Sequence, residues 1–150
     1  MDKLRLRPHG NYIITAPWQE LYLLTKHWKS DLTFYNYEIN FFIGLVDKNF
    51  IWITDKENII QVQHLVNMLM HLSKEREIID RNIIKHLNYL RLFLKNDYSH
   101  DQQSFRADHI DLENKLMLFA KSLRATKKDV FTISEQILSK EMPESLTDHL

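Results

Sequence analysis

Four residues whose side chains bind protons or metal ions follow one face of the first predicted helix. They are separated by seven, four and seven positions, and they are Glu20, His27, Asp31 and Glu38. Residues at such spacings lie on the same side of a helix, so the three carboxylates and the imidazole form one stripe. The stripe runs inside a broad apolar arc, where a charged group is costly unless it is paired or bound to a metal.

A second stripe of similar chemistry lies on the next predicted helix and contains His64, His71 and Glu75. The two stripes support the hypothesis of a metal site between the first and second helices, with the ligands Asp31, Glu38, His64 and His71. The Glu-x-x-His spacing of di-iron bundles occurs nowhere in the chain. We therefore favour the alternative, in which these side chains flank the core and either form ion pairs between helices or face a partner chain, and we expect no cofactor, no metal and no catalytic residue.

Polar side chains also occupy positions that the apolar periodicity assigns to the core, namely Arg76, His86, His109 and Thr126. We expect Arg76 to pair with a carboxylate against Trp28 and to set the register between helices, with an anion site as the alternative. We expect His86 and His109 to lie at neighbouring levels as neutral, hydrogen-bonded core residues, with a proton-sensitive pair as the alternative, since histidine titrates near neutrality. Such groups in a packing seam more often determine register than perform chemistry.

Three long helices have to position these side chains. Apolar residues recur at alternating steps of four and three, a spacing that fits a helix with one packing seam and excludes a β-strand. The seam positions of the first third are Leu21, Thr25, Trp28, Leu32, Tyr35, Ile39, Phe42 and Val46. Those of the middle third are Val62, Leu65, Leu69, Leu72, Arg76, Ile79, Ile83, His86, Leu90 and Phe93. Those of the last third are Phe105, His109, Leu112, Leu116, Phe119, Leu123, Thr126, Val130, Ile133 and Ile137.

These seams predict helices over about 17–48, 55–96 and 100–142, and short connections make consecutive helices antiparallel. The fold class is therefore all-α: an elongated antiparallel bundle with coiled-coil-like packing. Capping boxes that begin at Thr54 and Ser99 are expected to start the second and third helices. The segments at which these two helices are most prone to bend are Ser73–Asn82 and Arg124–Asp129.

The turns also predict which residues lie level with one another. Trp28 is expected beside Arg76, and Leu90 beside His109. Leu72 is likewise expected beside Thr126.

The composition narrows the function classes. The chain has 150 residues, a net charge of zero and no cysteine, which argues against a general nucleic-acid binder and excludes disulfides and thiolate metal sites. Residues 1–16 are expected to form a basic arm, residues 17–142 the bundle, and residues 143–150 a polar tail. Because no apolar run is long enough to span a membrane and no signal-peptide pattern is seen, we expect a cytoplasmic protein without membrane insertion.

The first helix carries more apolar surface than two neighbouring helices require. Phe34, Phe41 and Leu45 lie on the side of its apolar arc that faces away from the seam. Aromatic residues are enriched at protein interfaces. We therefore expect a non-enzymatic protein that acts through contacts with other proteins, including a second copy of itself in a homodimer through the first helix.

Overall fold

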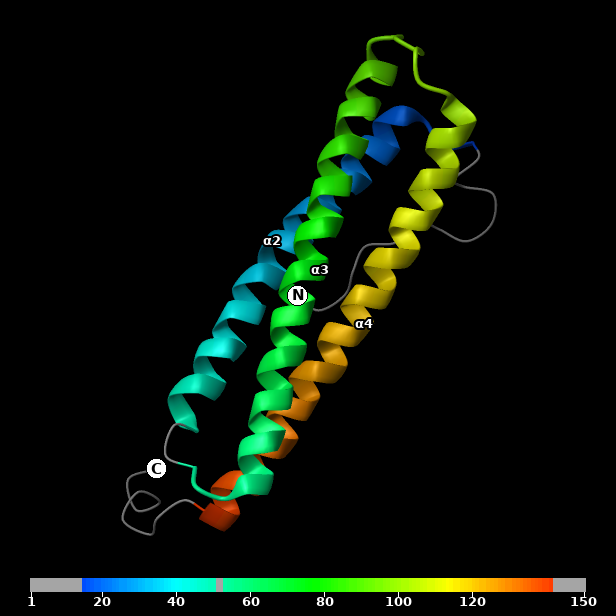
Figure 1. Cartoon of the computed structure of the whole chain (residues 1–150). Coiled ribbons are helices and arrows are strands. Elements are labelled where there is room, and N and C mark those ends of the chain that lie inside the picture. The colour runs from blue at the N-terminus through cyan, green and yellow to red at the C-terminus, as the bar shows by residue number, and fades with distance from the viewer. Residues whose placement is uncertain (1–14, 51–52, 142–150) are drawn as a thin grey trace.

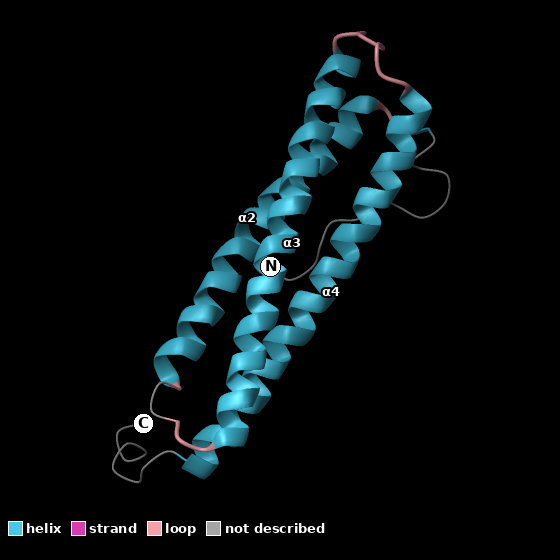
Figure 2. Cartoon of the chain, in the orientation of Figure 1, coloured by secondary structure: helices cyan, strands magenta, loops and turns pink. Residues whose placement is uncertain are grey.

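The chain folds into an elongated bundle of three long helices. The computed structural model describes residues 15–50 and 53–141, and every regular element within these ranges is an α-helix (Figures 1 and 2). The helices are α2 (Trp18–Asn49), α3 (Lys56–Leu94) and α4 (Gln102–Glu141). Consecutive helices run in opposite directions along the long axis (Figure 1). The predicted all-α antiparallel bundle is therefore confirmed, and each helix end lies within two residues of its predicted position.

None of the helices that the structure describes has a stretch apolar enough, over a sufficient length, to cross a lipid bilayer.

The heptad seams make the core. All eight predicted seam residues of α2 are buried, which matches the 3.6-residue period of a helix that rests on its neighbours along one stripe. In α3 and α4 the seam is buried as well, apart from Val62, Arg76 and Ile133, which are half-buried. The segments Ser73–Asn82 and Arg124–Asp129 lie inside continuous helices, so α3 and α4 span their lengths without a break.

Large rings fill the space between α2 and α4. The backbones of these two helices approach each other at few places, whereas α3 packs closely against both. Three α2 residues at heptad spacing reach across the gap, and each contacts one ring of α4. The ring centroids lie 4.8 Å apart for Trp28 and His109, 5.8 Å for Tyr35 and Phe119, and 5.6 Å for Phe42 and Phe131. The bulk of these side chains keeps α2 and α4 further apart than either is from α3.

The relative level of the helices differs from the prediction by about one turn. Lys29 Nζ donates a hydrogen bond to Asp80 Oδ1 at 3.1 Å. Because Trp28 directly precedes Lys29, it lies level with Asp80 and not with Arg76. Likewise, the residue bonded to His109 is His86, one turn before Leu90. The predicted levels were wrong because they assumed symmetrical turns, whereas side-chain packing allows one helix to slide along another by a whole turn.

The helix ends also differ in detail from the predicted caps. Helix α3 is capped by Asp55, whose carboxylate accepts a hydrogen bond from the Asn58 amide at 3.2 Å, so the predicted cap at Thr54 was one residue early. Before α4, it is Asp101 whose carboxylate accepts a bond from the Gln103 amide at 2.9 Å, two residues after the predicted cap at Ser99. Aspartate, like serine and threonine, satisfies the free amides of a first turn.

Helix α3 ends in a Schellman motif. The amide of Asp97 donates to the Leu92 carbonyl at 2.9 Å and that of Asn96 to the Phe93 carbonyl at 3.0 Å. Asn96 has a φ of 61°, the left-handed conformation that this motif requires. The motif ends the helix at Leu94, two residues before the predicted end.

The predicted arm (1–16) falls outside the described residues except for Thr15 and Ala16, and the predicted tail (143–150) lies wholly outside them. Ala16 is buried in the core at the end of the bundle where α2 begins, and its carbonyl accepts a hydrogen bond from Arg106 Nη2 at 3.2 Å. The Arg106 guanidinium also lies 4.0 Å from the ring centre of Trp18, so α4 holds the start of α2 by a cation–π contact.

Candidate functional site

A column of four rings in contact crosses the bundle near the α3–α4 turn. Phe105 of α4 stacks on His86 of α3, with centroids 4.0 Å apart. His86 stacks on His109 of α4 at 5.0 Å, and His109 lies against Trp28 of α2 at 4.8 Å. All three helices therefore contribute to one buried stack, with the two imidazoles in its centre.

The two imidazoles are joined by a hydrogen bond. His86 Nε2 lies 2.8 Å from His109 Nδ1, and the two residues are 5% and 0% exposed, respectively. Burial, together with the charge of His109, lowers the pKa of His86 to about 3. A proton added to His86 would place a charge among closely packed aromatic side chains, so His86 stays neutral near pH 7.

The four candidate metal ligands do not form one site. Glu38 Oε2 accepts a hydrogen bond at 2.8 Å from Lys127 Nζ of α4. His64 and His71 are exposed and line a hollow between α3 and α4. Asp31 is half-buried on α2. Among the residues that the structure describes, no three histidine, aspartate or glutamate side chains gather closely enough to hold a metal ion.

The first two residues of the stripe on α2, Glu20 and His27, are both exposed. The stripe therefore begins in solvent and becomes half-buried only at Asp31 and Glu38.

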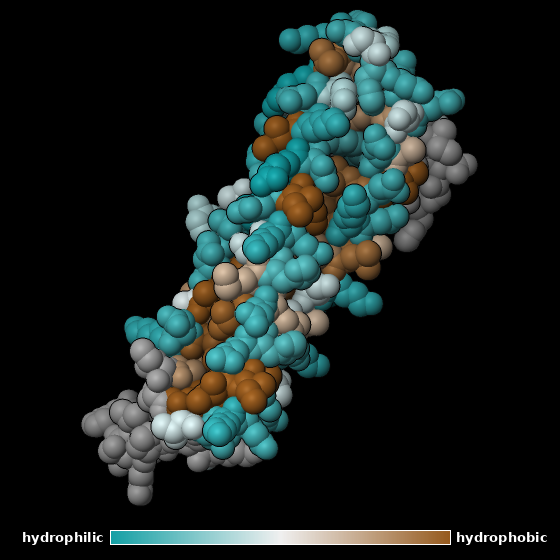
Figure 3. Space-filling view, in the orientation of Figure 1, coloured by the Kyte–Doolittle hydropathy of each residue, from teal (hydrophilic) through white to brown (hydrophobic). Residues whose placement is uncertain are grey.

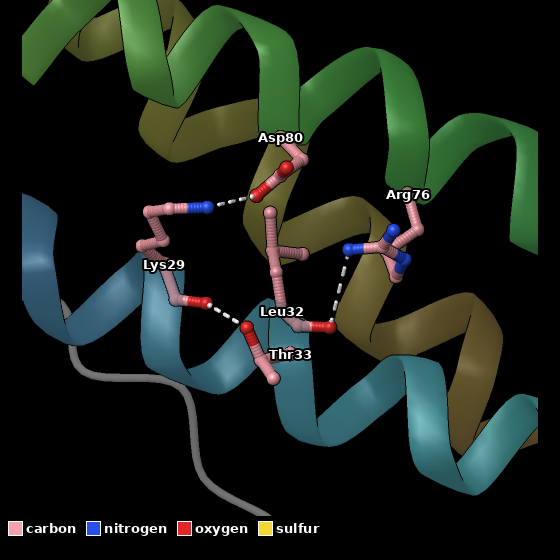
Figure 4. A network of polar contacts seen from close by, with 5 residues as sticks. All are labelled: Lys29, Leu32, Thr33, Arg76 and Asp80. Atoms are coloured by element: carbon pink, nitrogen blue, oxygen red, sulfur yellow. Dashed lines mark hydrogen bonds and ion pairs between the residues drawn. The ribbon is translucent and has the colours of Figure 1, made fainter.

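Arg76 makes a contact between helices, but with a backbone atom. Its Nη1 donates to the Leu32 carbonyl of α2 at 3.5 Å, beside the ion pair of Lys29 with Asp80 (Figure 4). Figure 4 shows both contacts joining α2 to α3 on either side of the Leu32 side chain, and Thr33 returns a hydrogen bond to its own helix. Arg76 forms no ion pair with a carboxylate among the described residues, so the expected pair is wrong, and His109 rather than Arg76 lies against the ring of Trp28.

Thr126 is buried, and its hydroxyl is satisfied within α4. Oγ1 donates to the Ser122 carbonyl at 2.9 Å, one turn back along the helix. Thr25 in the α2 seam does the same, donating to Leu21 O at 2.7 Å. Since threonine can satisfy its hydroxyl in this way, it fills a seam position without a polar partner on another helix.

A shallow groove runs between α3 and α4. It consists of three hollows in a row. The middle hollow shares Asn82 and Lys115 with the hollow nearest the α3–α4 turn, and it shares Glu75 and Ser122 with the third hollow. The hollow nearest the α3–α4 turn has a volume of about 220 Å³ and is lined by residues that include Lys85, His86, Tyr89, His100, Asp108 and Asp111. The middle hollow is the most apolar, and its rim carries the exposed side chains of Ile78 and Leu118.

Large apolar side chains are exposed on several helices. On the face seen in Figure 3, hydrophobic patches lie between hydrophilic side chains over much of the length of the bundle. On α2, the exposed aromatic residues are Phe34, Tyr37 and Phe41, which are 42%, 68% and 62% exposed. Leu45, the third residue expected at an interface, is half-buried and packs against the core around Val46. The aromatic face therefore consists of Phe34, Tyr37 and Phe41.

The sequence predicted an ion pair between helices for Glu38, but neither the burial of Glu113 nor the identity of the partner of Glu38. Glu113 of α4 is 5% exposed, although it lies outside the apolar seam. The ion pair of Glu38 with Lys127 joins α2 to α4, where backbone contacts are few. The signal that was available for this pair is the position of Glu38 at the border of the apolar arc, one helical turn from Phe34 and Phe42.

Comparison of the chain with protein-family models, with curated protein sequences and with solved structures finds no match.

Proposed function

We propose that this protein is a non-enzymatic helical bundle that acts through contacts with other proteins, and that one of these contacts is with a second copy of itself. The observation that carries the proposal is the aromatic face of α2, formed by Phe34, Tyr37 and Phe41. Aromatic side chains contribute much of the binding free energy at interfaces, because they bury a large area with few rotatable bonds.

The aromatic face rests on a rigid base. Phe41 contacts the ring of the buried Phe42, with centroids 5.5 Å apart, and Phe42 in turn contacts Phe131 of α4 at 5.6 Å. Phe34 lies 6.4 Å from the ring of the buried Tyr35. The exposed rings are thus backed by core rings, so little conformational entropy is lost when a partner covers them.

Sedimentation of the purified full chain tests the proposal, and we expect a mass that rises from one copy to two with concentration. Phe41→Glu should shift this equilibrium to the single copy by placing a charge in the interface. Leu118→Glu is the matched control, because Leu118 is also 62% exposed but lies on the groove between α3 and α4. A wild-type chain that stays a single copy at every concentration, or dissociation by Leu118→Glu alone, would contradict the proposal.

We also propose that the protein acts in the cytoplasm. The absence of cysteine from the sequence supports this, since the chain needs no oxidising compartment to fold. Fractionation of cells that express the tagged chain tests this location, and recovery with membranes or in the medium would contradict it.

A further inference from the structure

The aromatic face belongs to a second heptad frame on α2, which the core of one chain does not use. The members of this frame follow one another at steps of four, three, four, three and four, and all of them are exposed. They are Ser30, Phe34, Tyr37, Phe41, Gly44 and Lys48. The same spacing in the core seam of α2 is fully buried against α3 and α4. A heptad frame whose members are exposed has the geometry of a second helix-packing surface.

Gly44 is the member of this frame that the single chain does not explain. It lies inside α2, where glycine is among the least favourable residues. A Cβ atom added at Gly44 would meet nothing within 4 Å, so no neighbour in the described chain requires the missing side chain. A glycine in an exposed packing frame does, however, leave a notch that admits a large side chain from another helix.

We infer that two copies pair through α2 in an antiparallel orientation, with the ring of Phe34 in each copy seated over Gly44 of the other. This inference rests on the self-association proposed above and specifies its geometry. The frame is symmetrical about Ile39, so antiparallel alignment at that level sets Tyr37 opposite Phe41 and Phe34 opposite Gly44. Large residues then face small ones twice in one interface, as a twofold axis requires.

A parallel pair in register fits less well. It would oppose Phe34 to Phe34 and Gly44 to Gly44, which crowds the interface at one level and leaves a void at the other.

The ends of the frame also complement each other in the antiparallel pair. Lys48 of one copy lies opposite Ser30 of the other, so a long side chain again faces a small one. Asp31 follows Ser30 in the sequence, and it lies level with Asp47 of the copy that contributes Lys48. The Lys48 ammonium can therefore lie between these two carboxylates, and within the described part of one chain Lys48 forms no ion pair.

Reversal of the charge at Lys48 tests this contact. Lys48→Glu would bring three carboxylates together at each end of the frame, so it should raise the dissociation constant of the dimer. Lys56→Glu is the control, because Lys56 is exposed in the first turn of α3 and lies outside the frame. A dissociation constant that Lys48→Glu leaves unchanged would contradict the antiparallel alignment.

Single cysteines test the orientation without background, because the natural chain has none. A disulfide forms only between positions that face each other closely. When Ser30→Cys and Lys48→Cys chains are mixed and oxidised, we expect a disulfide between the two different variants. Each variant oxidised alone should stay uncrosslinked, and efficient crosslinking of Ser30→Cys to itself would establish a parallel pair and overturn the inference.

Substitution of Gly44 tests the notch. Gly44→Leu should raise the dissociation constant of the dimer on the order of tenfold or more, whereas Gln63→Leu on the exposed face of α3 should leave it unchanged. Circular dichroism of the Gly44→Leu chain at low concentration should show an unchanged helical fold, since the site is open in the single chain. A dimer that tolerates Gly44→Leu would contradict the inference but leave the proposed self-association intact, whereas a single-copy wild-type chain would remove both.

Discussion

His86 Nε2 and His109 Nδ1 lie 2.8 Å apart in the core, with Phe105 stacked on the ring of His86 and Trp28 tilted against the ring of His109. In a hydrogen bond between two imidazole nitrogens, one ring donates and the other accepts. The two rings therefore cannot both be cationic while the bond exists. Because the bond joins α3 to α4 inside a ring column that reaches α2, protonation of the pair affects the packing of all three helices.

The first prediction is a loss of stability in acid. The pKa of His86 is about 3 in the folded chain, and an unfolded histidine titrates near 6.5. The unfolded state therefore takes up a proton that the folded state refuses, so stability is complete above pH 6.5 and falls as the pH approaches 3. The loss should reach about 1.4 kcal/mol per pH unit below 6 from this group.

Urea unfolding at several pH values between 7.5 and 4.5 measures this loss. Carboxylates also titrate in this range, so the comparison is with the double variant His86→Leu with His109→Leu, which retains every acidic residue. We expect the variant to lose less stability over the same interval. Equal pH dependence in both proteins would show that the histidine pair does not determine acid stability.

The second prediction concerns the ion pair between α2 and α4. Lys127 and Glu38 are only 16% and 17% exposed at their side chains, so removal of one partner leaves a poorly hydrated charge. Lys127→Met should destabilise the protein by about 1–3 kcal/mol in thermal or urea unfolding. Arg81→Met is the control, because Arg81 and Glu77 are 3.9 Å apart and largely exposed, and its loss should cost less than about 0.5 kcal/mol. Similar losses in the two variants would contradict the prediction.

A third prediction distinguishes register from anion binding at Arg76. Its hydrogen bond to Leu32 is long, and its Nε is buried with no hydrogen-bond partner in the described chain, so the guanidinium adds little net stability. Arg76→Leu should change the free energy of unfolding by less than about 1 kcal/mol. If the side chain sets the register of α2 on α3, the unfolding curves from tryptophan fluorescence and circular dichroism should separate. Coincident curves together with loss of phosphate binding would instead indicate an anion site.

The Schellman motif gives the fourth prediction. Asn96 adopts a positive φ, which glycine accepts more readily and β-branched residues resist. Asn96→Gly should leave the melting temperature unchanged or slightly raised, whereas Asn96→Val should cost about 1–2 kcal/mol. Calorimetry of both variants checks this, and a Val variant as stable as the wild type would show that the turn does not need the left-handed conformation.

The periodicity of the sequence predicted which side chains are buried, but not how far one helix slides along another. Every α2 seam residue from Leu21 to Val46 is buried, because a repeat of seven residues specifies one face of a helix. The axial position of one helix relative to another is a separate property, because the apolar faces of α2 and α3 stay in contact when α3 slides by one turn along α2. The contact of Lys29 with Asp80 depends on that axial position, and the repeat carries no information about it.

The polar residues illustrate the same limit. His86 and His109 were expected to be close because both interrupt the seams near one turn, and the structure joins them directly. An ion pair of Glu38 between helices was expected from its place in the polar stripe, and the structure confirms it, but its partner Lys127 was not predicted, because Lys127 does not interrupt a seam. The formation of this pair depends on the angle at which α4 crosses α2, a tertiary quantity with no counterpart in local spacing.

The close packing of α3 against both other helices has a consequence for the order in which the bundle forms and opens. Each large backbone interface joins helices that are adjacent in sequence, so the chain consists of two overlapping helical hairpins that share α3. Such local topology favours rapid folding. An outer helix can leave by breaking one interface, whereas α3 can leave only when both are broken. The amides of α3 should therefore be the last to exchange with solvent, and the outer helices should exchange through partial openings.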